Sequence, residues 1–101
     1  MPKIELKEST NLKASEAFSK IRGVLESDPD LKKLDSTYQC RFDEAALSGV
    51  AEGKKFKAKL SVSEGGPSTQ ILLLVDLPLL FAPFKSLVES TLKKKLAKAL
   101  S

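Results

Sequence analysis

The sequence contains no histidine and no tryptophan, and it has a single cysteine. Histidine is the near-neutral base and metal ligand of most hydrolytic sites, so its absence excludes Ser-His-Asp and Cys-His chemistry. The single cysteine, Cys40, cannot form a disulfide within the chain, which favours a reducing compartment. Because Tyr38 and Phe42 share its face of a strand, we expect Cys40 to pack in the core. The sequence therefore predicts no catalytic residues, no cofactor-binding residues and no metal ligands.

Long hydrophobic runs and targeting signals are also missing. The longest apolar run, Leu77 to Phe84, contains two prolines and is far shorter than the roughly 20 residues that cross a bilayer. The residues after Met1 alternate between polar and apolar in place of an apolar signal core. We therefore predict a cytoplasmic protein without a membrane span. With 101 residues, of which 42% are apolar and 30% charged, the chain fits a single domain over residues 1–101.

Alternation of polar and apolar residues predicts four strands, over 3–8, 38–43, 56–62 and 70–75. A weaker pattern over 45–52 does not define the limits of a strand, and its Gly49 is typical of a bulge. Residues 70–75 are apolar on both faces. Such a strand is expected in the centre of a sheet whose second face is also partly covered.

Two amphipathic helices are predicted, one over 12–26 and one over 83–100. Between the first helix and the next strand, Asp28 and Pro29 have turn chemistry, and Leu31 and Leu34 fit one further short turn. Pro83 suits the first turn of the last helix. The expected fold is α+β, with a four-stranded antiparallel sheet, two helices and the order β-α-β-β-β-α. A curved sheet would grip the last helix.

Both ends of the sequence resemble a known family. Val75-Asp76-Leu77-Pro78, then Ala82-Pro83-Phe84-Lys85 and a helix with Val88, Leu92 and Leu96, resemble the end of the polyhydroxyalkanoic acid system family of small bacterial proteins. Members also begin with a strand like Met1-Pro2-Lys3-Ile4. The family brings no established activity and no catalytic residues. The resemblance implies a cytoplasmic bacterial protein associated with storage-polymer metabolism or granules, and a reduced helix-grip-like fold.

The positive charge of the chain is concentrated in its last helix. Residues 1–83 carry 12 basic and 12 acidic side chains, so the net charge of +4 arises after them. Lys95 falls near the apolar stripe of this helix and is expected to extend its amine to water. A solvated helix face is the favoured interpretation, and binding to an anionic partner is the alternative. Nucleic acid is not expected as a partner, because the lysine rows lack arginine and stacking aromatic residues.

Other polar groups have structural explanations. The neighbouring carboxylates Asp28 and Asp30, and likewise Asp43 and Glu44, lie where turns are predicted and are expected to be solvated. The stretch Gly65-Gly66-Pro67 lacks the spacing and the lysine of a phosphate-binding loop. It predicts a hairpin turn.

The apolar segment before the last helix allows two interpretations. Its side chains either plug the open end of the sheet beneath the helix, which is the favoured interpretation, or form an exposed patch for a polymer, a lipid or a protein. The first functional hypothesis is a non-catalytic accessory protein of polyhydroxyalkanoate storage that engages a granule or a granule-bound partner. Its candidate interaction surface consists of Leu79, Leu80, Phe81, Lys85, Lys93, Lys94 and Lys98.

The alternative hypothesis is a carrier of a small hydrophobic ligand, such as an acyl chain. The ligand would occupy a cavity of roughly 300 Å³ or more between the sheet and the last helix. The candidate lining residues are Phe42, Phe56, Leu60, Leu73, Val88 and Leu92.

Overall fold

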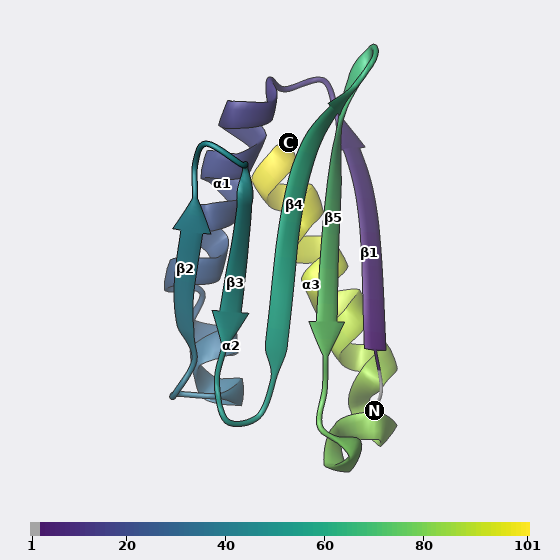
Figure 1. Cartoon of the computed structure of the whole chain (residues 1–101). Coiled ribbons are helices and arrows are strands. Elements are labelled where there is room, and N and C mark those ends of the chain that lie inside the picture. The colour runs from purple at the N-terminus through teal and green to yellow at the C-terminus, as the bar shows by residue number, and fades with distance from the viewer. Residues whose placement is uncertain (1–2) are drawn as a thin grey trace.

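A computed structural model describes residues 3–101, so Met1 and Pro2 at the start of the family-like stretch lie outside the described residues. The residues form one antiparallel sheet with the strand order β1-β5-β4-β3-β2 (Figure 1). Its strands are β1 (Lys3–Thr10), β2 (Gln39–Asp43), β3 (Ser48–Glu52), β4 (Lys57–Gly65) and β5 (Ser68–Asp76). The antiparallel α+β class is confirmed. The strand number is not, because the sheet has five strands and not four.

The strand that the prediction did not count is β3, and it contains no bulge. Gly49 pairs with Phe42 in an unbroken register between β2 and β3. A side chain at Gly49 would place its Cβ 2.4 Å from Cδ1 of Phe42, so the glycine makes room for the aromatic ring. The inward positions of β3 are Gly49 and Ala51, both buried. Small residues such as these give little hydrophobic alternation, which explains the weak signal.

Within residues 3–101, four helical segments complete the fold: α1 (Ala14–Ser27), α2 (Pro29–Leu34), the 3-10 helix η1 (Leu79–Phe84) and α3 (Lys85–Leu100). The short turn expected after the first helix is the helix α2. Asp28 caps it, since its Oδ1 accepts hydrogen bonds from the backbone N–H groups of Asp30 at 2.8 Å and Leu31 at 3.2 Å. Pro83 lies inside η1 and not in the first turn of α3. The last helix is therefore shorter than predicted and is preceded by a separate turn.

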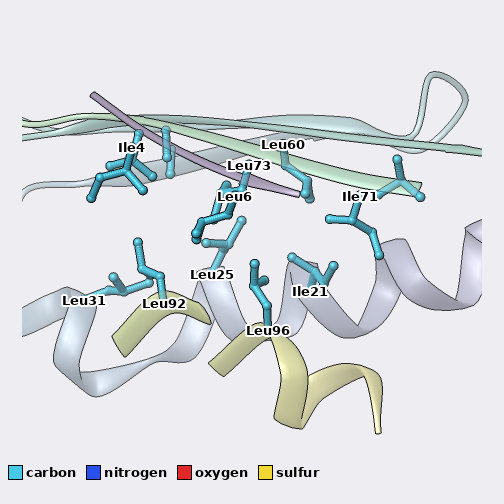
Figure 2. Packing of buried hydrophobic residues seen from close by; sticks show 14 of the residues in the cluster. Ile4, Leu6, Ile21, Leu25, Leu31, Leu60, Ile71, Leu73, Leu92 and Leu96 are labelled. Atoms are coloured by element: carbon cyan, nitrogen blue, oxygen red, sulfur yellow. The ribbon is translucent and has the colours of Figure 1, made fainter. Parts of the chain in front are cut away.

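The core lies between one face of the sheet and the helices (Figure 2). Inward side chains of the strands are buried, and Ile4 and Leu73 among them are 1% exposed. They meet Ile21 of α1 and Leu96 of α3, which are at most 2% exposed. Burial of each such side chain contributes about 1.5–3 kcal/mol. These contacts fix both long helices on the same face of the sheet.

Strand β5 lies in the interior of the sheet, between β1 and β4, as expected from its apolar sequence. The expectation that its second face is covered is wrong. Leu74 is 40% exposed, and it lies between Glu5 of β1 and Lys59 of β4. Within residues 3–101 the three α-helices lie on the opposite face (Figure 1), so the outer face of β5 is left to solvent.

Candidate functional site

Neither a membrane-spanning helix nor a metal centre marks a site in the part of the chain that the structure describes. No helix between Lys3 and Ser101 is both long enough and apolar enough to cross a membrane. Over the same residues, no three side chains among His, Cys, Asp and Glu gather where they could hold a metal ion. Cys40 is half-buried, with its Sγ 3.6 Å from the carbonyl oxygen of Leu25. Burial raises the pKa of this thiol, so it is a poor nucleophile.

The favoured interpretation of the apolar segment as a plug is wrong for its leucines. Leu79 is 74% exposed and Leu80 is 80% exposed. Leu77 is fully buried, and Phe81 is half-buried against the core. These two side chains take the inward positions of the segment, and the leucines between them are turned outward.

The exposed side chains stand on a well-defined turn. The backbone N–H of Phe81 donates a hydrogen bond to the carbonyl oxygen of Pro78 at 2.8 Å. Pro78 and Pro83 each restrict the backbone further. The exposed apolar surface continues along the chain, because Phe84 is 54% exposed and Leu87 is 65% exposed. We call Leu79, Leu80, Phe84 and Leu87 the apolar tip.

The structure brings only one of the four candidate lysines to the apolar tip. Lys85 is exposed at the start of α3, directly after Phe84. Lys93, Lys94 and Lys98 are exposed on the second half of the helix. Lys93 lies eight residues after Lys85, which places it about 12 Å further along the helix axis. The candidate interaction surface is therefore two separate surfaces.

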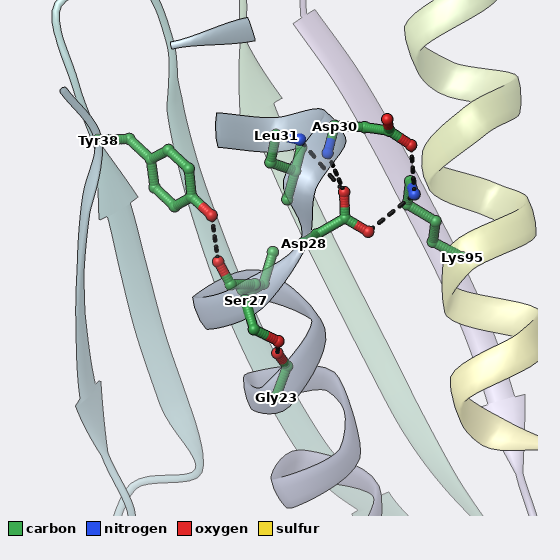
Figure 3. A network of polar contacts seen from close by, with 8 residues as sticks. Gly23, Ser27, Asp28, Asp30, Leu31, Tyr38 and Lys95 are labelled. Carbon is green, nitrogen blue, oxygen red and sulfur yellow. Dashed lines mark hydrogen bonds and ion pairs between the residues drawn. The ribbon is translucent and has the colours of Figure 1, made fainter. Parts of the chain in front are cut away.

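Lys95 makes an ion pair and does not extend to water as expected. Its Nζ lies 2.7 Å from Oδ2 of Asp28 and 2.9 Å from Oδ2 of Asp30 (Figure 3). Hydrogen bonds to these carboxylates raise the pKa of Lys95. Burial alone would raise the pKa of Asp28, but hydrogen bonds from Lys95 and from the backbone of Leu31 and Asp30 outweigh burial and lower it. The prediction that Asp28 is a solvated turn residue is thus wrong, and the second half of α3 is fastened to the turn between α1 and α2.

A small apolar cavity lies between the sheet, α2 and the first part of α3. Its volume is about 20 Å³, close to the 10–15 Å³ that one water molecule requires and far below about 300 Å³ for a ligand site. Every lining side chain is apolar. Four of the six candidate lining residues converge here, and the full lining is Leu31, Phe56, Ala58, Leu73, Val75, Leu77, Val88 and Leu92.

The other two candidate lining residues lie elsewhere. The ring of Phe42 packs edge-to-face on the ring of Phe18, with 5.9 Å between the ring centroids. The guanidinium carbon of Arg22 lies over the Phe42 ring, 4.9 Å from its centroid. Leu60 is 1% exposed in the body of the core, but it does not line the cavity. Alternation placed both residues on the inner face of the sheet, and it carries no information on which of them meet α3.

The wall that α3 contributes to the cavity is held unevenly. The first buried side chain of the helix is Leu92, and Leu96 is the second. Before Leu92, Val88 is only half-buried, and the N-cap residue Phe84 has no polar side chain with which to cap the helix. We call residues 85–91 the first half of α3 and residues 92–100 its second half, so the first half is the loosely held side of the cavity.

A polar network that sequence reasoning missed fixes the turn between β3 and β4. Asp35 is 2% exposed, and its carboxylate accepts hydrogen bonds from the backbone N–H of Thr37 at 2.9 Å and of Lys55 at 2.7 Å. Burial alone would raise the pKa of Asp35, but the hydrogen bonds from Thr37, Lys55 and Phe56 outweigh it and lower the pKa to about 2. A Cβ at Gly53 would lie 2.2 Å from Oδ2 of Asp35. A glycine 18 positions after a turn aspartate gives no sequence signal for this contact.

Comparisons with known proteins identify the fold class. No protein-family model and no curated protein matches the sequence. The crystal structure of TTHA0849 from Thermus thermophilus is similar, with a TM-score of 0.62 and 11% identity over 98% of this chain and 94% of that chain. A START superfamily protein from Mycobacterium smegmatis has a TM-score of 0.57 and 16% identity over 97% of this chain and 93% of that one.

The di-domain ARO/CYC BexL from the BE-7585A biosynthetic pathway is also similar. The TM-score is 0.65 at 13% identity, and the match covers 99% of this chain and 45% of that chain. Identities this low are evidence of a shared fold. The chain therefore has a START-like fold, in agreement with the helix-grip-like class that the resemblance implied.

Proposed function

We propose that this protein is a non-catalytic carrier of one apolar chain, such as the acyl chain of an aliphatic acid. The observation that carries the proposal is the wholly apolar cavity beneath the loosely held half of α3. The START-like fold supports it, since the fold resembles that of hydrophobic-ligand-binding proteins. An apolar lining without convergent polar groups suits an aliphatic chain better than a polar substrate.

A ligand requires the cavity to widen, because its volume of about 20 Å³ is too small for an acyl chain. Widening is easiest on the side of Val88, which is half-buried and precedes the first buried residue of α3. The second half of the helix stays in place through Leu96 and the ion pair of Lys95 with Asp28. The protein is thus expected to bind a chain by moving the first half of α3 outward.

The direct test is a titration with decanoate followed by amide and methyl NMR. Binding is expected to shift the signals of the residues that line the cavity, with Val88 and Leu92 prominent among them. Val88→Phe would fill the space and is expected to weaken binding at least about tenfold.

The matched control is Val50→Phe, which adds the same ring to a half-buried valine on the outer face of the sheet. It is expected to leave decanoate affinity unchanged. If decanoate shifts no cavity signal, or if both variants weaken binding equally, the carrier function is wrong.

A second proposed function is an accessory role in polyhydroxyalkanoate storage. The resemblance of both chain ends motivates it, and the exposure of Leu79 and Leu80 supports it by providing an apolar contact surface. Granule and soluble fractions from polymer-accumulating cells would be compared for the wild type and for Leu79→Asp with Leu80→Asp. Recovery on granules that the variant abolishes is the expected result, and a wholly soluble wild type contradicts the role.

A further inference from the structure

The apolar tip shows the features of a surface that is built to remain exposed. Leu77, which precedes the apolar tip, is fully buried, and Phe81, which follows Leu80 in the sequence, packs against the core. The turn between them is closed by the hydrogen bond from Phe81 to Pro78. Leu79 and Leu80 are thus held outward by a fixed backbone, so contact with a partner costs little conformational entropy.

A group of lysines lies at the same end of the molecule as the apolar tip. The turn between β3 and β4 and the segment before η1 together line a shallow depression of about 260 Å³, which includes Lys54, Lys55, Lys57 and Pro78. Figure 1 shows this turn, η1 and the start of β1 at the lower end of the molecule. The lysines here are Lys3, Lys54, Lys55, Lys57 and Lys85, all exposed.

Few carboxylates oppose these lysines. Asp76 is half-buried and lies between Lys3 and Lys57 in the strand register. Glu52 makes a long ion pair with Lys57 at 3.9 Å. Asp35 is buried, and its carboxylate accepts hydrogen bonds from the backbone N–H groups of Thr37 and Lys55 and from the hydroxyl of Thr37. The five lysines outnumber these three carboxylates, so this end of the molecule carries a net positive charge beside the apolar tip.

We infer that this end of the molecule, the apolar tip with its surrounding lysines, docks on an anionic lipid bilayer. Exposed leucine and phenylalanine side chains insert at the boundary between headgroups and acyl chains, and lysines near the surface attract anionic headgroups. The two terms act together only if both groups can reach the membrane at once, and the segments that carry them lie at the same end of the molecule (Figure 1). The inference does not depend on the ligand proposed above.

A second copy of the chain is a poorer occupant of this surface. Most homodimers use the same patch on both subunits. Such a contact would bring the lysines of one copy, including Lys54 and Lys55, against those of the other. Like charges in an interface are unfavourable. The charge of the patch thus favours an anionic partner.

The first test is co-sedimentation with phosphatidylcholine vesicles, with and without phosphatidylglycerol. We expect binding only to the vesicles that contain phosphatidylglycerol, and weaker binding as salt is raised. Leu79→Ser with Leu80→Ser is expected to weaken binding at least about 100-fold. The matched control is Leu72→Ser with Leu74→Ser on the outer face of the sheet, which should bind within about threefold of the wild type once circular dichroism shows that it is folded.

The second test separates this end of the molecule from the lysines further along α3. Lys54→Gln with Lys55→Gln is expected to weaken vesicle binding about 30-fold, because each lysine near an anionic surface contributes about a factor of five. Lys93→Gln with Lys94→Gln removes the same charge elsewhere and is expected to have a much smaller effect.

Three results would overturn the inference. The first is no binding to vesicles with phosphatidylglycerol, including the case in which the protein binds lipid-free polyhydroxybutyrate particles instead. The second is an equal loss of binding in the two lysine variants. The third is a wild type that sediments as a dimer and becomes monomeric on Leu79→Ser with Leu80→Ser. A failure of the ligand proposal would appear separately, since the decanoate titration contains no vesicles.

Discussion

The two halves of α3 differ in how they are attached to the rest of the molecule. The second half contributes Leu92 and Leu96 to the core and fastens Lys95 to Asp28 and Asp30. The first half has no buried side chain, and its Leu87 is 65% exposed. One helix thus combines a stabilising half with a half that is free to move or to meet a partner. Binding sites are commonly drawn from such weakly held segments.

The largest loss of stability is expected when a buried side chain in the second half of α3 is shortened. Leu96 is 2% exposed, and Leu96→Ala is expected to lower the free energy of unfolding by about 2–5 kcal/mol through lost burial and a cavity. Urea denaturation measures this change. Leu87→Ala is the control on the same helix, and an equal loss for the two variants would contradict the contrast between the halves.

The next largest loss of stability is expected at Asp35, which supports the turn between β3 and β4 at the end of the molecule that carries the apolar tip. Asp35→Ala leaves the N–H groups of Thr37 and Lys55 without their acceptor. Each buried unsatisfied group costs about 1–3 kcal/mol, so a similar loss of unfolding free energy is expected. Thermal and urea unfolding would measure it. An unchanged stability would show that the turn between β3 and β4 does not depend on Asp35.

The same carboxylate predicts a dependence of stability on pH. The pKa of Asp35 is lowered from 3.8 to about 2 in the folded protein. Its contribution is therefore fully present above pH 3.8 and is lost as the pH falls through about 2. Urea titrations across this interval should show a decline in the wild type that is reduced in Asp35→Asn. Parallel curves would contradict the assigned network.

A smaller effect is expected at the ion pair of the second half. Lys95→Met removes the partner of Asp28, whose side chain is 11% exposed. Stability should fall by less than for Leu96→Ala but by more than for Lys94→Met, in which an exposed lysine is replaced. Salt should reduce the difference between the two lysine variants. Equal stabilities would show that the ion pair does not fasten α3.

The smallest effect is expected at the apolar tip. Leu80 is 80% exposed, so Leu80→Ser should change the free energy of unfolding by no more than about 0.5 kcal/mol. A loss above about 1 kcal/mol in urea denaturation would show that the side chain packs against the core. That outcome would also restore the interpretation of this segment as a plug.

Local patterns predicted much of the fold. Strict alternation in 3–8 and 56–62 located β1 and β4, and three- and four-residue spacing located α1 and α3. Strand β3 was not counted, because its inward residues Gly49 and Ala51 are small. Which face of β5 is covered could not be predicted, since both faces of that strand are apolar. The face that is covered depends on where the helices pack.

Contacts distant in the sequence account for what the sequence did not reveal about the candidate site. The partners Lys95 and Asp28 are separated by most of the chain. The turn lysine Lys55 and Pro78, which precedes the apolar tip, lie in different elements and meet only in the folded structure. Hydrophobicity also does not show which side of a turn faces inward. The leucines at 79 and 80 and the phenylalanine at 81 have similar apolar character, yet only Phe81 packs against the core.

The most direct measurement is amide hydrogen exchange along α3, with and without decanoate. We predict that residues 89–91 exchange faster than residues 93–96 in the free protein, because only the latter half is fastened to the core. Decanoate should slow exchange at 89–91 and leave 93–96 unchanged. Uniform exchange along the helix, with no response to decanoate, would contradict both the difference between the halves and the carrier function built on it.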